Sequence, residues 1–171
     1  MGIGTVNSQF VTLAPGATKI LEALNIGTLG EGWAEATLPP GVTGYAVFRQ
    51  VIAGRANQEA VVPLTLESKL SADLIYDDVL FTTSVAFLNP SGQQTTVTIA
   101  VFNENGTQIG SALVVLPARS KVSTRLKDLN GLSGMAGNRG WASFTVSSGA
   151  VSMIGLRFGA EAFTSIPAPQ R

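Results

Sequence analysis

A nineteen-residue stretch occurs twice in this chain, and this repeat constrains the fold more than any other feature of the sequence. Residues 32–50 read GWAEATLPPGVTGYAVFRQ, and residues 140–158 read GWASFTVSSGAVSMIGLRF without a gap. Six of the nineteen aligned positions are identical, where average composition would give about one or two matches. We therefore expect one structural unit to occur twice, and 171 residues leave room for two such modules.

The rest of the chain shows the alternation and the β-branched runs of strands, with little helical periodicity. Asn, Pro and Gly separate these runs, and NENG at 103–106 predicts a tight hairpin turn. Seven strands are expected within fewer than a hundred residues of the second half, which is typical of a β-sandwich. They are 83–88, 95–102, 108–116, 121–126, 141–146, 151–158 and 162–166. The sequence therefore predicts an all-β protein of two antiparallel β-sandwich modules related by internal duplication.

The first half carries counterparts of only the last five of these strands. They are expected at 6–13, 18–24, 33–38, 44–51 and 59–64. Nothing in the first half corresponds to the opening pair of the second, 83–88 and 95–102. The predicted organisation is an incomplete N-terminal module at 1–66, a linker at 67–78 and a complete seven-stranded module at 79–171.

A module without its two opening strands exposes backbone groups and core side chains, so something is expected to fill the gap. The linker could fold back, the second module could pack against the opening, or another chain could insert strands by β-augmentation. A chain that begins inside the first module would leave the same gap. Open edges are commonly managed within one chain, so coverage of this kind or a boundary inside the module is favoured over completion by a second molecule.

The repeated hairpin places a tryptophan and an arginine on one face. Because alternate strand residues point to opposite faces, Trp33 shares a face with Arg49, and Trp141 shares one with Arg157. Pairing across the connecting loop would bring each tryptophan opposite its arginine. We predict a cross-strand stack of guanidinium on indole in each copy, contributing about 0.5–1 kcal/mol if exposed. The apolar, core-facing set is expected to be Ala34, Ala36, Leu38, Ala46, Phe48, Ala142, Phe144, Val146, Ile154, Leu156 and Phe158.

Each tryptophan could instead serve as a platform for a sugar ring. Aromatic side chains of this kind more often pack beneath a loop or a neighbouring module, and packing is therefore the favoured interpretation.

Composition excludes several classes of chemistry. The chain has neither histidine nor cysteine, so it cannot build a Ser/His or Cys/His nucleophile system, and no catalytic or cofactor-binding residue is expected. Adjacent Asp77 and Asp78 could help to hold calcium, but neighbouring strand residues point apart and no ligand-rich loop accompanies them. We expect these carboxylates to hydrogen-bond a turn and no metal site to form.

The charge pattern points away from nucleic acids and membranes. Eleven basic and eleven acidic residues cancel without forming a basic cluster, which argues against nucleic-acid binding. The apolar runs are of strand length, so no membrane span is expected. The start MGIGTVNSQF lacks the basic and apolar regions of a secretory leader. Only 13% of residues are charged, and such a surface suits association with other proteins.

Several short strings occur along the chain in the order GYAVFRQ, QEAVVPL, an Asp-Asp segment, SVAFLNPS, RGWASFTV, IGLRF and FTSIP. Together they resemble the uncharacterised tandem Ig-like β-sandwich region at the C-termini of large secreted proteins of environmental bacteria. The resemblance implies export, an extracellular or cell-surface setting and a non-catalytic role. It also implies that the first module normally begins with two further strands.

These observations lead to two expected functions of different classes. The first is a structural or adhesive protein that acts through contacts with itself or with a neighbouring protein module, and that self-assembles by strand complementation of the first module. The second is a carbohydrate-binding module that uses Trp33 or Trp141 to bind a glycan.

Overall fold

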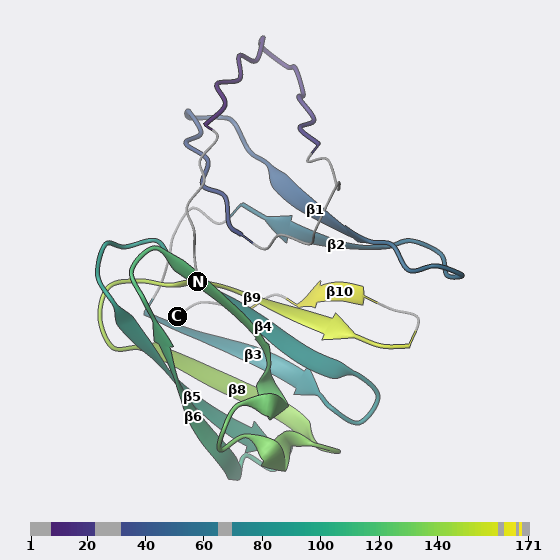
Figure 1. Ribbon diagram of the computed structural model, residues 1–171, viewed down its shortest axis with the longest axis vertical. Coiled ribbons are helices and arrows are strands. Elements are labelled where there is room, and N and C mark those ends of the chain that lie inside the picture. Colours follow the sequence, from purple (N-terminus) through teal and green to yellow (C-terminus); the bar gives the residue numbers. More distant parts are fainter. Residues whose placement is uncertain (1–7, 23–31, 65–69, 161–162, 167, 169–171) are drawn as a thin grey trace.

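The computed structural model describes residues 8–22, 32–64, 70–160, 163–166 and 168. This part of the chain is all-β, and its antiparallel strands form three sheets (Figure 1). The elements are β1 (Tyr45–Gln50), β2 (Gln58–Pro63), β3 (Ser71–Asp77), β4 (Thr82–Asn89), β5 (Thr95–Asn103), β6 (Gln108–Leu116), β7 (Ser120–Arg125), the 3₁₀ helices η1 (Leu126–Asp128) and η2 (Ser133–Met135), β8 (Arg139–Val146), β9 (Ser152–Phe158) and β10 (Phe163–Ile166).

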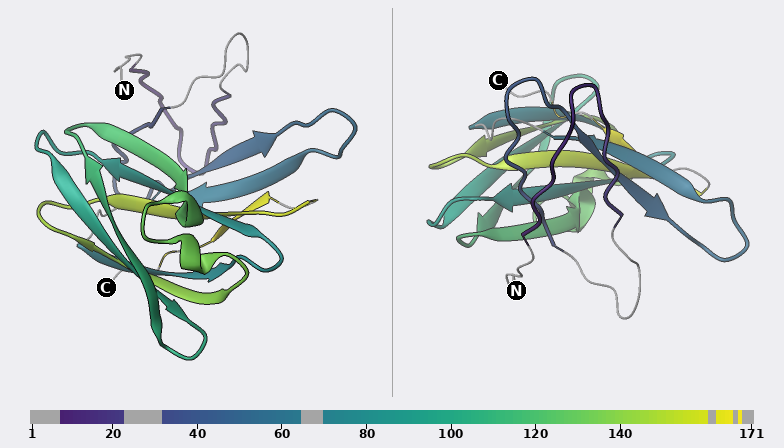
Figure 2. Two further views of the ribbon diagram at one scale, coloured as in Figure 1. Left: turned by 60° about the horizontal axis from the view of Figure 1, so that its bottom comes forward. Right: turned by 90° about the horizontal axis from the view of Figure 1, so that it is seen from above.

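Two four-stranded sheets form a sandwich, with strand orders β10-β9-β4-β7 and β3-β8-β5-β6 (Figures 1 and 2). Alternate residues of their strands meet in one hydrophobic core, where the rings of Phe87 and Phe144 lie 5.7 Å apart. The two 3₁₀ helices add Leu126 and Met135 to this core. The predicted all-β sandwich is confirmed.

Each strand expected in the second half is present, from β4 to β10, and β6 matches the expected 108–116 at both ends. The predicted turn at 103–106 joins β5 to its partner β6. Gly106 takes a φ of 76° there, and the side-chain oxygen of Asn103 accepts the backbone N–H groups of Asn105 and Thr107 at 3.0 and 2.9 Å. The turn could be predicted because Asn and Gly tolerate this tight backbone geometry.

The structure differs from the expected linker at 67–78, because this segment contains β3. β3 pairs with β8 from Ser71↔Thr145 to Asp77↔Arg139 and buries Leu74 and Tyr76. The sandwich therefore begins before residue 79 and has eight strands, not seven. The alternation of apolar and polar residues in SADLIYD is the strand signal that the linker assignment overlooked.

The second copy of the repeat is not a hairpin. β8 and β9 belong to different sheets, and the connection between them crosses from one layer of the sandwich to the other. Ala142, Phe144 and Val146 face the core as expected. On β9 the expected faces are reversed, because Met153 packs against the core and a Cβ on Gly155 would lie 2.4 Å from Leu74.

The opposite, outward set of β9 holds the three residues that were expected in the core, Ile154, Leu156 and Phe158. The prediction assumed that the two strands share one face of a hairpin. Because they lie in different sheets, it assigned the core-facing and outward residues of β9 the wrong way round.

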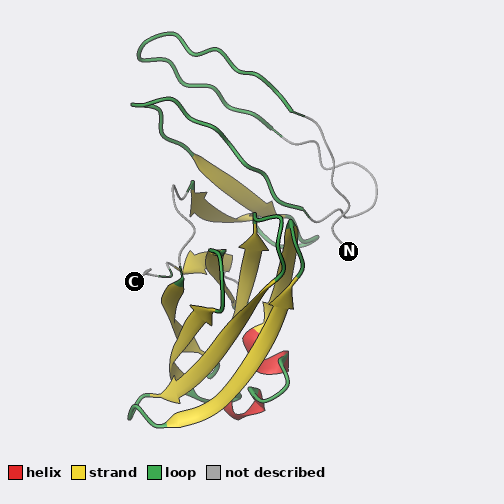
Figure 3. Ribbon diagram, turned by 90° about the vertical axis from the view of Figure 1, so that its left-hand side faces the viewer, coloured by secondary structure: helices red, strands yellow, loops and turns green. Residues whose placement is uncertain are grey.

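The first half is built differently. β1 and β2 form a two-stranded sheet, as expected for 44–51 and 59–64. The described residues of the other three expected strands, 6–13, 18–24 and 33–38, form no strand, and positions 6–7 and 23–24 lie outside the described residues. Figure 3 shows the extended green segments that precede β1 standing apart from the yellow sandwich.

The first half meets the sandwich where β2 lies against β10. The Ser165 hydroxyl donates a hydrogen bond to the Val61 carbonyl at 2.6 Å, and the Arg55 guanidinium donates one to the Ala160 carbonyl. These contacts attach the β1–β2 sheet to the edge of the sandwich, while residues 45–49 of β1 and Val61 of β2 stay exposed.

Candidate functional site

Exposed apolar side chains are concentrated in the first half of the molecule. Ala60 is the one buried residue among described residues 8–22 and 32–64. Many large apolar side chains in these segments are open to solvent, and Phe10 is 98% exposed. Monomeric proteins seldom leave large amounts of apolar surface uncovered. We define the N-terminal apolar surface by the exposed side chains of Phe10, Ile20, Leu21, Tyr45, Val47, Phe48, Val51 and Val61.

The β1–β2 sheet presents part of this surface in a regular way. Val47 lies opposite Val61, and the strand alternation places Tyr45 on the same face. Tyr45 is 69% exposed, while Val47 and Val61 are each about half exposed. Within the described residues β1 pairs with β2 alone, so its other edge has unpaired backbone groups. The sheet therefore offers both an apolar face and an open edge.

Arg49 does not stack on Trp33. In the register of the sheet Arg49 lies opposite Glu59, and its Nε is 2.8 Å from the Glu59 carboxylate. Trp33 lies in a segment without strand pairing and is 37% exposed. The predicted cross-strand pair is wrong in the first copy because residues 33–38 do not pair with β1.

The second predicted pair is wrong as well, because β8 and β9 lie in different layers. Trp141 stacks on Phe102 of the neighbouring β5, with ring centroids 4.2 Å apart and planes inclined by 10°. Arg157 lies over the ring of Phe81, 5.2 Å from its centroid, and its Nε is buried without a hydrogen-bond partner. The alternation of β5 places Phe102 on the outer face of its strand, and this pattern could have predicted a neighbour for Trp141.

The stack bears on the sugar-platform alternative. A platform needs an open ring face against which the sugar can lie. Phe102 covers one face of Trp141, and Ile75 is its neighbour on the other side in β3. This geometry disfavours Trp141 as a platform and leaves the exposed Trp33 as the better candidate.

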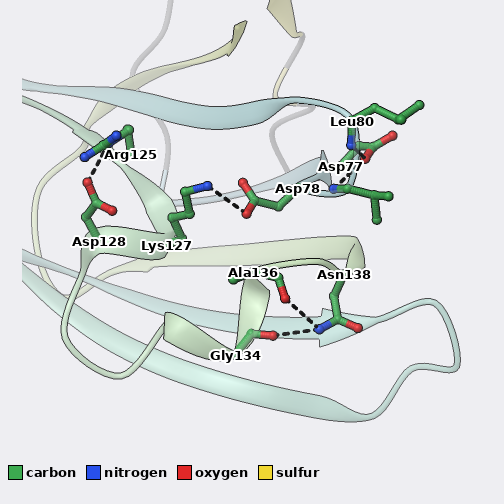
Figure 4. Close-up of polar contacts among 10 residues, drawn as sticks. Asp77, Asp78, Leu80, Arg125, Lys127, Asp128, Gly134, Ala136 and Asn138 are labelled. Atoms are coloured by element: carbon green, nitrogen blue, oxygen red, sulfur yellow. Dashed lines mark hydrogen bonds and ion pairs between the residues drawn. The ribbon is translucent and has the colours of Figure 1, made fainter. Parts of the chain in front are cut away.

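The Asp77 side chain holds the turn between β3 and β4 (Figure 4). One oxygen of Asp77 accepts the backbone N–H groups of Val79 and Leu80 at 3.0 and 3.1 Å, and the other lies 3.0 Å from Arg139. Burial acts to raise the pKa of Asp77, but the hydrogen bonds from Leu80 and Val79 together with Arg139 lower that pKa below its ordinary value. The predicted turn role is confirmed for Asp77, whereas the Asp78 side chain pairs with Lys127 instead.

The neighbouring carboxylate has a different environment. Asp78 is almost fully buried, and its oxygen lies 3.1 Å from the Lys127 ammonium (Figure 4). Burial raises the pKa of the Tyr76 hydroxyl, and the negative charges of Asp78 and Glu104 raise it further. Among the described residues no group of three or more Asp, Glu, His or Cys side chains is placed to hold a metal ion. Each aspartate is occupied by its own partner.

No helix within the described part of the chain is both long and apolar enough to cross a membrane. Comparisons with protein-family models, with curated proteins and with solved structures find no match to this chain. The functional assignment therefore depends on the geometry of the molecule and on the sequence patterns described above.

Proposed function

We propose that this protein is a non-catalytic structural or adhesive β-sandwich protein that acts through protein–protein contacts, with strands of a second copy completing its first half. The observation that carries this proposal is the N-terminal apolar surface, where Ala60 alone is buried among the described residues before β3. Burying apolar area of this kind is the main favourable term in protein association.

The pairing of the sandwich supports the proposal. Within the sandwich β6 pairs only with β5, β7 pairs only with β4, and β8 pairs with β3 and β5. By the sequence repeat, the segments 6–13, 18–24 and 33–38, whose described residues form no strand, correspond to β6, β7 and β8. Each of them would need a partner equivalent to β4 or β5, and the described residues of the first half supply neither. β1 and β2 correspond to β9 and β10, which pair with each other, and they alone form a sheet.

The same correspondence identifies the surface that a donor would cover. Tyr45 and Val47 align with Met153 and Gly155, which face the core on β9. β9 also pairs with β4 along the edge away from β10. A donor strand would therefore pair with the free edge of β1, and its companion would cover Tyr45 and Val47 from the opposite layer.

Coverage from within one chain receives no support from the described residues. β3, from the expected linker, pairs with β8 in the sandwich, and β10, which lies against β2, leaves Tyr45 and Val47 of β1 exposed. The extracellular setting is part of the proposal and is supported by the resemblance of the sequence strings to secreted proteins.

Solution mass tests completion by a second copy. The mass of the parent protein is expected to rise above 17.7 kDa with concentration in sedimentation velocity. The double variant Tyr45→Lys/Val47→Lys places charge on the face to be covered, and should weaken assembly at least about tenfold. Ile75→Lys is the matched control because Ile75 is also 69% exposed but lies in the sandwich. Assembly that is equally strong in the parent and in the double variant would overturn the proposal.

The carbohydrate-binding alternative retains one supporting observation, the exposure of Trp33. If it holds, Trp33→Ala should abolish retention on immobilised polysaccharide while the protein stays folded by circular dichroism. Trp141→Ala is the control, because this ring is already stacked on Phe102. Equal retention of the two variants and the parent would remove a role for Trp33.

A further inference from the structure

The four outer edges of the sandwich are protected to different degrees. β3 carries Asp73 and Asp77, and β7 carries Lys121 and Arg125. The third edge, β10, lies against β2. The fourth is β6, whose sequence QIGSALVVL contains neither a charged residue nor proline (Figure 1). Charges and prolines on edge strands prevent them from pairing with other chains, and β6 lacks both.

Only the middle of β6 is open. The glycine-rich loop after η1 packs against its beginning so closely that a Cβ on Gly131 would lie 2.2 Å from the Ser111 carbonyl oxygen. At its end the Leu116 carbonyl accepts a hydrogen bond from the Asn89 side chain at 3.2 Å. Residues 112–115 remain between these two contacts. β5 pairs with one side of them, and no described strand pairs with the other.

The open part of β6 also has an apolar face. Leu113 is 69% exposed and Val115 is 52% exposed, both on the outer face of the sheet. A surface hollow lies beside Leu113, bordered by Thr98, Ser111 and Asn130. Free backbone groups, two apolar side chains and open space are therefore found together at one edge.

We propose that residues 112–115 of β6 form a dimerisation edge that pairs antiparallel with the same edge of a second copy, joining two four-stranded sheets into one of eight strands. A second copy fits because the edge is uncharged, so two identical edges meet without like-charge repulsion. Antiparallel pairing about a two-fold axis brings the same patch of both copies together. The pairing also covers Leu113 and Val115, which the N-terminal apolar surface does not include.

The faces of the sheet restrict the register of this pairing. Residues opposite each other in an antiparallel pair point to the same face. Leu113 must therefore lie opposite an outward residue of the other copy, and centring the pair on Val114 brings it opposite Val115. Both exposed apolar side chains of each copy are then used, and the paired residues 113–115 lie within the open segment 112–115.

The test uses the full chain carrying Tyr45→Lys/Val47→Lys, so that assembly through the N-terminal apolar surface does not contribute. This protein is expected to sediment at twice 17.7 kDa, with more dimer at higher concentration. Adding Leu113→Lys/Val115→Lys places four like charges together in the dimer and should weaken it at least about a hundredfold. Ile75→Lys, on the opposite edge strand and equally exposed, should leave the dimer intact.

A charge-swap experiment separates failed pairing from failed folding. The lysine variant mixed with a Leu113→Glu/Val115→Glu variant should form a heterodimer at low salt, while each alone stays monomeric. In the protein without β6 substitutions, amide exchange at residues 112–115 should slow as concentration rises. A monomer at all concentrations, or a dimer unaffected by the β6 charges, would overturn the proposed β6 pairing. Neither result would bear on completion of the first half, which the mass comparison of the parent and the Tyr45→Lys/Val47→Lys variant tests.

Discussion

The two copies of the nineteen-residue repeat, 32–50 and 140–158, carry similar sequences but have different structures. In the second half, residues 140–158 supply a strand to each layer of a packed sandwich. In the first half, residues 32–50 supply β1 alone, with most side chains exposed. The difference is in the partners available, because β8 and β9 are flanked by β3, β5, β4 and β10, while among the described residues β1 pairs with β2 alone. Strand-forming sequence becomes sheet only where its backbone groups find partners.

The largest expected difference between the halves is the loss of stability when one phenylalanine in each is replaced. Phe144 is 2% exposed and packs against Phe87, whereas Phe48 is 55% exposed. Phe144→Ala should lower the free energy of unfolding by about 3–5 kcal/mol, because it leaves a cavity in the core. Phe48→Ala should cost less than about 0.5 kcal/mol. Urea titration of both variants measures the difference, and similar costs would mean that Phe48 is packed in solution.

The two ion pairs provide the second contrast. Lys127 pairs with the buried Asp78, while Arg49 and Glu59 are both about half exposed. Lys127→Met leaves a buried carboxylate without its partner and should destabilise the protein by about 2–3 kcal/mol. Arg49→Met should cost less than about 0.5 kcal/mol. Denaturation midpoints test this contrast, which would fail if both changes were equally mild.

The glycines that open each copy give a third, sharper contrast. A Cβ on Gly140 would lie 2.0 Å from the Phe102 carbonyl oxygen, whereas a Cβ on Gly32 would meet nothing within 4 Å. Gly140→Ala should cost about 2 kcal/mol or more, because backbone must move to admit the methyl group. Gly32→Ala should change stability by less than about 0.5 kcal/mol. Thermal unfolding compares them, and a large loss at Gly32 would show that the first copy packs like the second.

The smallest effect concerns acid stability of the sandwich. The pKa of Asp77 is lowered in the folded protein, so its ionised form contributes stability that is fully present above the unfolded value of about 3.9. That contribution is lost as pH falls through the lower folded pKa. Asp77→Asn should make the urea midpoint less sensitive to pH between about 5 and 3 than in the parent. An unchanged pH profile would contradict the assigned role of Asp77.

Local signals identified much of the sandwich and little of the first half. β6 was predicted at both ends, and the Asn103 turn followed from residues that hydrogen-bond their own backbone. The turn role of Asp77 followed in the same way. The Trp/Arg pairs failed because their prediction required knowing which strands are neighbours. The exposure of Phe48 could not be predicted either, since the strand alternation placed it among the core-facing residues.

The sequence by itself determined the all-β class, the strands of the second half and the absence of histidine and cysteine chemistry, because these depend on local periodicity and residue type. The tertiary structure alone decided that β3 joins the sandwich, that β8 and β9 separate into two layers, and that β1 keeps an open edge. These outcomes depend on pairing between residues far apart in the chain, which local patterns do not encode.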